Sequence, residues 1–266
     1  MSLSSIKILV RGAGEQATAV AYRLYQSHFR VVLTETSHPE AVRREVAFCE
    51  AVHDGQKTVE GVTARLIGSA NEIFGIWQKN DIPVLVDPEA RVKSILKPDV
   101  IIDATIAKRN LGNSLKDARL VIGLGVGFVA GRDVHAVIET NRGHNLGRVI
   151  RQGEAEADTG VPGSIMGYSS ERVLRAPKEG IFSSDRIIGE QVQAGDKVAE
   201  VDGAVLQASI SGVIRALLRP GTSVQKGTKS GDVDPRGIRE YCFTISDKGR
   251  AIAGAVLEAI LAEFNS

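Results

Sequence analysis

An internal repeat in the second half of the chain constrains its fold more than any other sequence feature. A shift of 32 residues aligns the segment from Ala176 with the segment from Ala208 without a gap. The matched pairs are Ala176 and Ala208, Gly180 and Gly212, Gly189 and Gly221, Val192 and Val224, Gln193 and Gln225, Gly195 and Gly227, Val201 and Val233, and Asp202 and Asp234. Matched glycines mark matched turns between short strands. The repeat therefore predicts two copies of one β unit that pack together as a sandwich.

The repeated segments resemble the biotinyl and lipoyl carrier domains. The motifs that carry the resemblance are Ala176-Pro177-x-x-Gly180, Val192-x-x-Gly195-Asp196-x-Val198, Gly212-Val213-Ile214 and Val224-x-x-Gly227. Carriers of that family present a modified lysine on the hairpin that joins the two halves. The joining segment here, residues 200–208, contains no lysine. The resemblance implies a barrel-sandwich hybrid fold with a scaffold or docking role, and a swinging-arm role is not expected.

The first half of the chain begins with a strand, a glycine-rich turn, a helix and a second strand. The β-prone run 6–10 is followed by Gly-Ala-Gly-Glu-Gln-Ala at 12–17, and the next strand-like run, 30–34, ends at Glu35. This order matches the G-x-G-x-x-A pattern of dinucleotide-binding folds, in which an acidic residue follows about 20 residues later. The pattern predicts a Rossmann-like parallel sheet.

In such a turn, backbone N–H groups at the start of the helix can hold phosphates. The residues predicted to bind a nucleotide there are Gly12, Ala13, Gly14, Glu15 and Gln16, with Glu35 accepting from a ribose hydroxyl. Glu35 favours a nicotinamide cofactor without a 2′-phosphate. Glu15 argues against this interpretation, because its charge would oppose a pyrophosphate, although an acid also stabilises a helix N-terminus. A purely structural turn is the alternative.

The alternation of helices and strands continues beyond Glu35. The predicted helices cover 39–53, 69–77 and 89–97, and the predicted strands cover 84–87, 100–103, 120–124 and 134–138. Apolar strands between helices are typical of a parallel sheet that is covered on both faces. Ligands of such sheets bind at the carboxyl ends of the strands, so Asp103, Thr105, Lys108 and Arg109 are further candidate contacts. The alternative is a solvated loop.

Two other segments carry more polar groups than turns require. Asn141, Arg142 and His144 lie between the last predicted strand and the sandwich, and Lys229, Asp232, Asp234 and Arg236 lie in a predicted loop at 226–237. The charged side chains of the second segment could bind an anionic ligand. In that case Arg236 would form two hydrogen bonds to a phosphate or carboxylate. Both segments are candidate contacts for a ligand or a client protein. The alternative is that the charges in each loop satisfy one another.

Composition excludes several classes of protein. The formal net charge is +1, with 43% hydrophobic and 24% charged residues, so no basic surface for nucleic acid is expected. No apolar run is long enough to span a membrane, and the first residues do not form a secretory leader. Cys49 and Cys242 lack metal-ligand spacing, and no catalytic triad or carboxylate pair is evident. We therefore expect a cytoplasmic protein without a metal site, and its catalytic residues, if any, are unknown.

Four strings together resemble one family, the YqeB-type proteins of the selenium-dependent molybdenum hydroxylase system. They are Arg-Gly-Ala-Gly-Glu-Gln-Ala (11–17), Ile-Glu-Thr-Asn-Arg-Gly-His-Asn-Leu-Gly-Arg-Val-Ile (138–150), Glu-Arg-Val-Leu-Arg-Ala-Pro (171–177) and Lys-Ser-Gly-Asp-Val-Asp-Pro-Arg-Gly (229–237). The resemblance implies a role in maturation of a molybdenum hydroxylase. It also suggests an analogy with chaperones that load the molybdenum cofactor, so a molybdopterin dinucleotide is a candidate ligand of the glycine turn besides NAD, and a hydroxylase is the candidate client.

Together these patterns predict a Rossmann-like nucleotide-binding domain at 1–143, a biotinyl/lipoyl-like β-sandwich at 144–245, and a C-terminal helix at 246–266 that packs on the rest. An NAD-dependent oxidoreductase and a non-catalytic interaction module are the alternative functions. Exposed sheet edges are compatible with a homo-oligomer.

Overall fold

The computed structural model describes residues 3–265, which divide into two compact units. The larger unit contains residues 3–39, Ala47–Asp158 and 245–265, and the smaller unit contains Glu40–Val46 and Thr159–Thr244. The chain therefore crosses between the units after residues 39, 46, 158 and 244. A short segment early in the sequence thus belongs to the same unit as the repeat.

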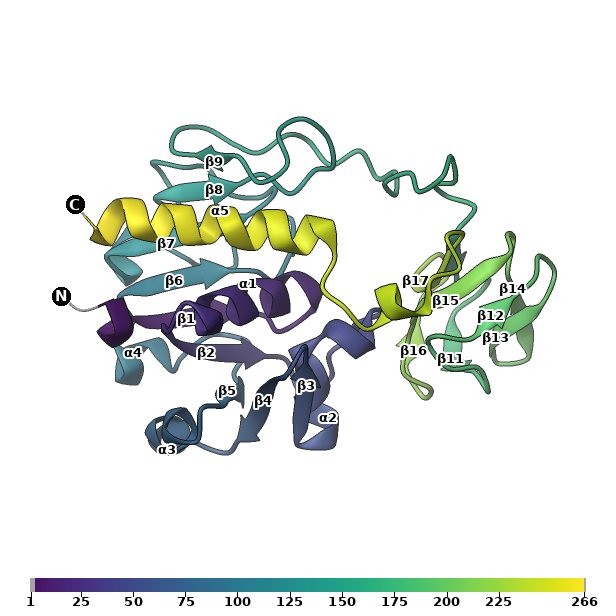
Figure 1. The fold of residues 1–266 in the computed structure, drawn as a ribbon, viewed down its shortest axis with the longest axis horizontal. Helices are drawn as coiled ribbons and strands as arrows, with labels where there is room; N and C mark the ends of the chain where they lie inside the picture. Colours follow the sequence, from purple (N-terminus) through teal and green to yellow (C-terminus); the bar gives the residue numbers. More distant parts are fainter. Residues whose placement is uncertain (1–2, 266) are drawn as a thin grey trace. The chain divides into compact units, whose positions relative to one another are not determined.

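The larger unit is an α/β structure built on one mixed sheet (Figure 1). Within the described residues this sheet has nine strands in the order β3-β4-β5-β2-β1-β6-β7-β8-β9. In chain order they are β1 (Lys7–Arg11), β2 (Arg30–Glu35), β3 (Gln56–Val59), β4 (Val62–Ile67), β5 (Ile82–Val86), β6 (Val100–Asp103), β7 (Leu120–Leu124), β8 (Ala136–Ile138) and β9 (Val149–Ile150). The six central strands and β4 run parallel, and only the outermost strands, β3 and β9, pair antiparallel with their neighbours.

The strand order changes direction at the centre of this sheet. After β1 the chain forms β2, β3, β4 and β5 on one side of β1, and it then crosses to the other side of β1 to form β6, β7 and β8. The carboxyl ends of β1 and β6 therefore lie side by side, with Arg11 paired in register with Asp103. In open α/β sheets such a switch point leaves a crevice outside the strand ends.

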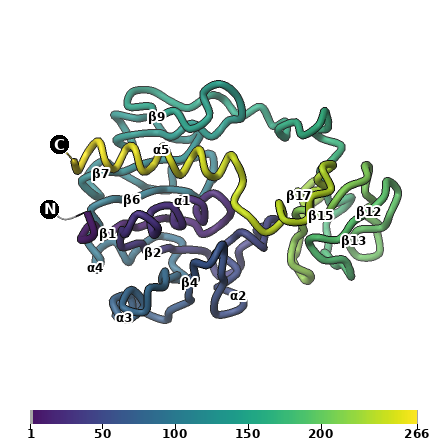
Figure 2. The backbone as a smooth tube through the Cα atoms, viewed as in Figure 1, coloured from purple at the N-terminus to yellow at the C-terminus, as the bar shows by residue number. Residues whose placement is uncertain are grey.

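Helices cover both faces of the sheet. The helices are α1 (Glu15–Gln26), α2 (Ala51–Asp54), α3 (Ile73–Gln78), α4 (Lys93–Leu96) and α5 (Asp247–Phe264). The C-terminal helix α5 runs beside α1 (Figure 2), and Gly249 permits the close approach, since a Cβ there would lie 2.9 Å from the Ala19 Cβ. Residues of α3 and α4, such as Ile73 and Leu96, pack with Leu9 and Ile101 in a core on the opposite face.

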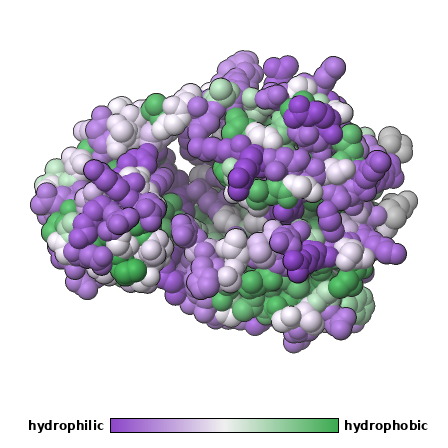
Figure 3. All heavy atoms as spheres, turned by 180° about the vertical axis from the view of Figure 1, so that it is seen from behind, coloured by the Kyte–Doolittle hydropathy of each residue, from purple (hydrophilic) through white to green (hydrophobic). Residues whose placement is uncertain are grey.

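A cavity of about 560 Å³ lies at the amino ends of β2 and β5 and is lined by aromatic residues that include Tyr25, Phe74 and Trp77. Hydrophobic atoms also gather along the lower border of the larger unit (Figure 3). Because ligands of α/β sheets bind at the carboxyl ends of strands, this cavity lies at the wrong edge to belong to the predicted crevice.

The smaller unit contains two four-stranded antiparallel sheets that follow the sequence repeat. Their orders are β10-β17-β15-β12 and β14-β13-β11-β16. The strands are β10 (Val173–Arg175), β11 (Gly180–Ser183), β12 (Gln191–Val192), β13 (Lys197–Val201), β14 (Ala204–Gln207), β15 (Gly212–Leu217), β16 (Ser223–Val224) and β17 (Lys229–Asp234). A shift of 32 residues maps β10, β11, β12 and β13 onto β14, β15, β16 and β17. Each sheet therefore takes two strands from each copy of the repeat.

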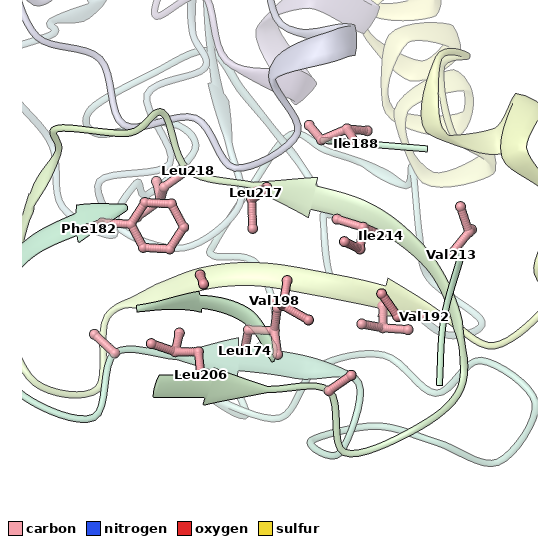
Figure 4. Close-up of a cluster of buried hydrophobic side chains, with 14 of the residues drawn as sticks. Leu174, Phe182, Ile188, Val192, Val198, Leu206, Val213, Ile214, Leu217 and Leu218 are labelled. Carbon is pink, nitrogen blue, oxygen red and sulfur yellow. The ribbon is translucent and has the colours of Figure 1, made fainter. Parts of the chain in front are cut away.

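Backbone hydrogen bonds other than those of the strand ladders are also repeated after 32 residues. Phe182 N–H donates to Thr222 O, and its counterpart Ile214 N–H donates to Glu190 O. Gly195 N–H donates to Ala208 O, and Gly227 N–H donates to Ala176 O. The two copies enclose one apolar core that includes Phe182, Leu206 and Ile214 (Figure 4). Neither copy can bury its apolar residues alone, which is why the two copies form one unit.

Three expectations from the sequence need correction. Residues 39–53 do not form one helix: they contain the 3₁₀ turns Arg44–Val46 and Phe48–Glu50, and only α2 at the end is helical. The helix predicted at 89–97 is reduced to α4. The segment 226–237 is not a loop, because residues 229–234 form the buried strand β17. In each case tertiary contacts outweigh the local sequence pattern.

The boundary between the units also differs from the predicted one at 143/144. The larger unit continues to Asp158, since β9 pairs with β8 and Ala130 bridges to Gly153.

A glycine replacement tests the packing of the repeat. We expect Gly212→Ala to destabilise the chain by about 1–3 kcal/mol beyond any cost of the backbone conformation, because the new Cβ would lie 2.3 Å from Asp234 O. Gly221→Ala is the matched control, since its φ is +90° but nothing lies within 4 Å of the added Cβ. Urea unfolding measures both variants, and equal free energies of unfolding would contradict the packing argument.

Candidate functional site

The glycine turn lies at the carboxyl end of β1, at the switch point of the sheet. Gly12 has a φ of +91°, and a Cβ there would lie 3.0 Å from Ala104 O in the turn after β6. Only glycine therefore fits at this position. Gly14 is the N-cap of α1, and nothing lies within 4 Å of a Cβ added to it. The backbone is consequently open at the start of the helix.

Glu35, at the end of β2, bonds to the turn itself. One carboxylate oxygen accepts from Ala13 N–H at 2.8 Å, and the other accepts from Thr36 N–H at 2.7 Å. Each oxygen has a second lone pair, so the carboxylate can still accept from a ribose hydroxyl. The predicted partners Ala13 and Glu35 are thus brought together by a direct hydrogen bond.

Three backbone donors at the start of α1 remain open. Among the described residues, no acceptor bonds to the N–H groups of Gly14, Gln16 or Ala17. The side-chain oxygen of Gln16 is buried and also lacks a hydrogen-bond partner within the described chain. A helix start with free N–H groups attracts an anion. The buried Gln16 oxygen could accept a hydrogen bond from a ligand, since buried polar atoms in proteins are usually hydrogen-bonded.

Asp103 takes part in a buried network. Its side chain is fully buried, with one oxygen 3.3 Å from the Arg11 guanidinium and 2.6 Å from Asn113 Nδ2. The other oxygen accepts from the N–H and the hydroxyl of Thr105, the latter at 2.6 Å. The prediction that Asp103 contacts a ligand directly does not match this geometry. Asp103 instead fixes Thr105, which lies next to Gly12.

The loop after Thr105 folds back onto the sheet. The backbone of Lys108 and Arg109 approaches Gly127 so closely that a Cβ on Gly127 would lie 2.4 Å from Arg109 N. Lys108 forms an exposed ion pair with Asp158. Thr105 therefore adjoins the glycine turn, whereas the charged end of Lys108 is engaged by an acid of the same unit.

The start of α5 lies next to the start of α1, which the sequence did not indicate. The Ser246 hydroxyl, which caps α5, bonds to the Glu15 carboxylate at 3.1 Å. Arg142 forms a bidentate pair with Asp247, at 2.8 and 3.0 Å. The predicted residues Glu15 and Arg142 are therefore both tied to the first turn of the C-terminal helix.

Lys248, in the same turn of α5, was missed by the sequence analysis. Its ammonium makes no hydrogen bond or ion pair within the described residues. Burial lowers the pKa of Lys248, and the charge of Arg142 lowers it further. Glu15, Glu139 and Asp158 act in the opposite direction. A partly desolvated lysine without an ion-pair partner is a candidate binding group. No local motif marks it, since its neighbours come from distant parts of the sequence.

The remaining candidates of the first polar segment lie beside Glu139. This buried carboxylate accepts from Asn141 N–H at 2.6 Å and from Glu156 N–H at 2.7 Å. Asn141 also bonds to the Glu156 side chain. His144 is exposed and has no hydrogen bond among the described residues. This segment is held in shape by Glu139 and leaves His144 at the surface.

The second polar segment belongs to the smaller unit. Arg172 and Lys229 both pair with the buried Asp232, and Arg236 pairs with the buried Asp234 at 2.6 Å while stacking on Tyr241. Burial acts to raise the pKa of Asp234, but hydrogen bonds and charge from Arg236, with the charge of Arg215, hold it below its usual range. These charges pair with one another, as the alternative interpretation expected, although Asp232 Oδ1 is buried without a hydrogen-bond partner in the described part of the chain.

The described part of the chain was also searched for metal ligands, membrane-spanning helices and reactive cysteines. No group of three or more metal-ligating side chains occurs there. None of the helices in residues 3–265 has the length and apolar character needed to cross a bilayer. Cys49 and Cys242 are free and buried, and burial raises the pKa of both thiols, which keeps them protonated and unreactive.

The fold and the site define an α/β protein with an open glycine turn at the carboxyl edge of a mostly parallel sheet. The chain is 48% identical over 254 residues to the uncharacterized protein YqeB of Escherichia coli K12, a match that supports a YqeB-type identity. It covers 96% of this chain and 47% of that protein, so the chain spans about half the length of this curated relative. No protein-family model matches the chain.

Solved structures with a partial likeness have low identity. An aspartoacylase family protein of Mesorhizobium loti is 14% identical, with a TM-score of 0.27 and coverage of 86% of this chain and 85% of that one. The product-bound ectoine utilization protein EutE of Ruegeria pomeroyi is 10% identical, with a TM-score of 0.26 and coverage of 86% and 85%. TcdA (CsdL) is 11% identical, with a TM-score of 0.30 and coverage of 99% and 90%. Likenesses this weak carry no functional argument.

Removal of the Asp103 charge tests the network at the strand ends. We expect Asp103→Asn to lower the free energy of unfolding by about 3–5 kcal/mol, because the buried Arg11 guanidinium would lose its anionic partner. Glu89→Gln, which breaks an exposed pair with Arg91, is the control and costs less than about 1 kcal/mol. Urea unfolding compares them, and a cost for Asp103→Asn as small as that of the control would contradict the assigned role.

Proposed function

We propose that the crevice at the carboxyl ends of β1, β2 and β6 binds a nucleotide-bearing ligand, either NAD or the molybdenum cofactor as a dinucleotide. The observation that carries this proposal is the open start of α1, where three N–H groups have no acceptor among residues 3–265. A phosphate at this position would receive these donors and the positive end of the helix dipole. Glu35 would accept from the ribose.

The proposal treats the larger unit as Rossmann-like. Its support is the strand order around β1, the glycine turn between β1 and α1, and the acid that ends β2. The smaller unit, with its repeated strands, is proposed to be a barrel-sandwich hybrid related to biotinyl and lipoyl carriers. Its hairpin between β13 and β14 turns at Asp202 and Gly203 and presents no lysine, so this unit serves in docking.

Lys248 is proposed to complete the phosphate site. It lies in the first turn of α5, whose Ser246 bonds to Glu15 at the start of α1. Within the described residues the Lys248 ammonium has no ion-pair partner, and its charge interacts with that of Glu15, the residue that opposes a pyrophosphate. With that charge offset, an anionic ligand is favoured at the turn.

At the level of the cell, we propose a cytoplasmic accessory protein for the maturation of a selenium-dependent molybdenum hydroxylase, with that enzyme as client. The support is the four-string resemblance and the similarity to YqeB, which is itself uncharacterized. Calorimetric titration of NAD, NADP and molybdopterin dinucleotide identifies the ligand. Hydride transfer to bound NAD would favour an oxidoreductase, and the absence of all binding would leave an interaction module.

A bulky side chain at Gly14 tests the crevice directly. We expect Gly14→Leu to abolish binding of the nucleotide ligand while the chain stays folded, because the added side chain meets open space and covers the N–H groups. Gly75→Leu is the control, since its Cβ also meets open space and α3 lies away from the turn. Calorimetry measures affinity and circular dichroism measures folding. Retained affinity in a folded Gly14→Leu variant would overturn the assignment.

The pH dependence of binding tests Lys248. Because its pKa is lowered, the ammonium loses its proton at a lower pH than an exposed lysine does. We therefore expect ligand affinity to be constant at low pH and to fall as the pH rises through this lowered pKa, at a lower pH than an exposed lysine would give.

Lys248→Met should remove this fall and weaken binding at neutral pH. The exposed Lys79→Met is the control and should retain the wild-type profile. An unchanged profile in Lys248→Met would exclude Lys248 from the phosphate site.

A further inference from the structure

The internal symmetry of the smaller unit reveals one covered face and one bare face. In the sheet β10-β17-β15-β12, residues at the outer-face positions are buried: Val173 is 9% exposed, Asp232 4% and Val213 0%. A shift of 32 residues places their counterparts in the sheet β14-β13-β11-β16. These are Val205, which is 48% exposed, Glu200, which is partly exposed, and Ile181, which is 48% exposed.

The chain itself covers the first face. Val42 and Phe243 pack against the core cluster that contains Val213 and Cys242, and Leu217 N–H donates to Val42 O. The second face has no such cover among the described residues and exposes two β-branched side chains that alternate with polar ones. Equivalent backbone positions thus carry apolar residues in both copies, but only one copy is covered.

The charges on the two faces differ in one respect. Asp232 pairs with Lys229 at 3.3 Å and also with Arg172. Its counterpart Glu200 pairs with Lys197 at 2.6 Å, but Ala204 stands at the position that corresponds to Arg172. Glu200 therefore has a lysine partner, as Asp232 has, but it has no counterpart of the arginine that pairs with Asp232.

A cavity of about 250 Å³ lies beside Glu200. It is lined by Ser183, Ser184, Asp185, Arg186, Lys197, Val198, Ala199 and Glu200. Arg186 pairs with Glu190, whereas Asp185 is exposed and makes no hydrogen bond or ion pair within the described residues. The cavity thus holds two carboxylates, one of them unpaired, and one lysine that is already engaged.

We propose that this face, defined by Ile181, Asp185, Glu200 and Val205, docks a segment of a partner protein that presents an arginine between β-branched residues. The guanidinium enters the cavity and pairs with Glu200 and Asp185, as Arg172 pairs with Asp232 in the other copy. Arginine fits better than lysine because its planar fork can bond to two acceptors at once. The flanking apolar residues cover Ile181 and Val205, as the chain covers Val173 and Val213 in the other sheet.

The test uses the full chain and the blocked peptide acetyl-Val-Arg-Val-amide as the probe. Titration followed by amide resonances should shift Ser183–Arg186 and Lys197–Glu200 selectively. Acetyl-Val-Lys-Val-amide and acetyl-Val-Ala-Val-amide are the control peptides, and the arginine peptide should bind about tenfold more tightly than the alanine peptide. Shifts spread over other surfaces, or equal affinity of the arginine and alanine peptides, would overturn the proposal.

Variants locate the contact. The double variant Asp185→Asn with Glu200→Gln should lower the affinity of the arginine peptide about tenfold, because both carboxylates lose their charge. Glu179→Gln is the matched control, since Glu179 is also an exposed acid of the repeat but does not line the cavity. Thermal unfolding checks that all variants are folded. An affinity of the double variant equal to that of Glu179→Gln would refute the docking site.

Discussion

The carboxyl edge of the large sheet depends on one buried arginine. Arg11 ends the central strand, is 4% exposed, and bonds to Asn113 at 2.7 Å and to the carbonyls of Leu111 and Pro88. Its charge is tolerated in the interior because Asp103 lies in register on the adjacent strand. The loops after β5 and β6 are thereby fixed to β1. The glycine turn is therefore flanked by loops of fixed conformation, and preorganisation of this kind reduces the entropy that a site loses on binding.

The sequence predicted those parts of the structure whose determining residues lie close together in the chain, and it failed where distant residues determine the structure. The run from β1 through α1 to β2 was predicted well, because its turn, helix and strand signals all lie within 35 residues. The two β units of the smaller unit were predicted because their matched glycines can be found by comparing two segments of the sequence. The prediction of one helix at 39–53 was wrong because this segment is divided between the units: Glu40–Val46 belong to the smaller unit, and the residues from Ala47 belong to the larger one.

The candidate site shows the same division. The bond from Ala13 to Glu35 joins two signals that the sequence pattern already links. Lys248, Ser246 and Asp247 could not be assigned to the site from the sequence, since they approach Glu15 and Arg142 only through the packing of α5 on α1. The strand β17 was missed for a similar reason: its acids look solvated until Arg172, 60 residues from Asp232 in sequence, is placed beside them.

The four crossings between the units make the smaller unit discontinuous in sequence. Its segment Glu40–Val46 supplies Arg44, whose side chain donates to Leu217 O at 2.8 Å, and Arg43, which donates to Tyr241 O at 2.8 Å. A gene fragment that encodes only residues 159–244 would therefore omit an integral part of that unit. A protease that cuts at one crossing would leave the two units covalently linked through the others. Exchange of this unit between proteins as a contiguous cassette is thus disfavoured, and the two halves of the chain are expected to be inherited together.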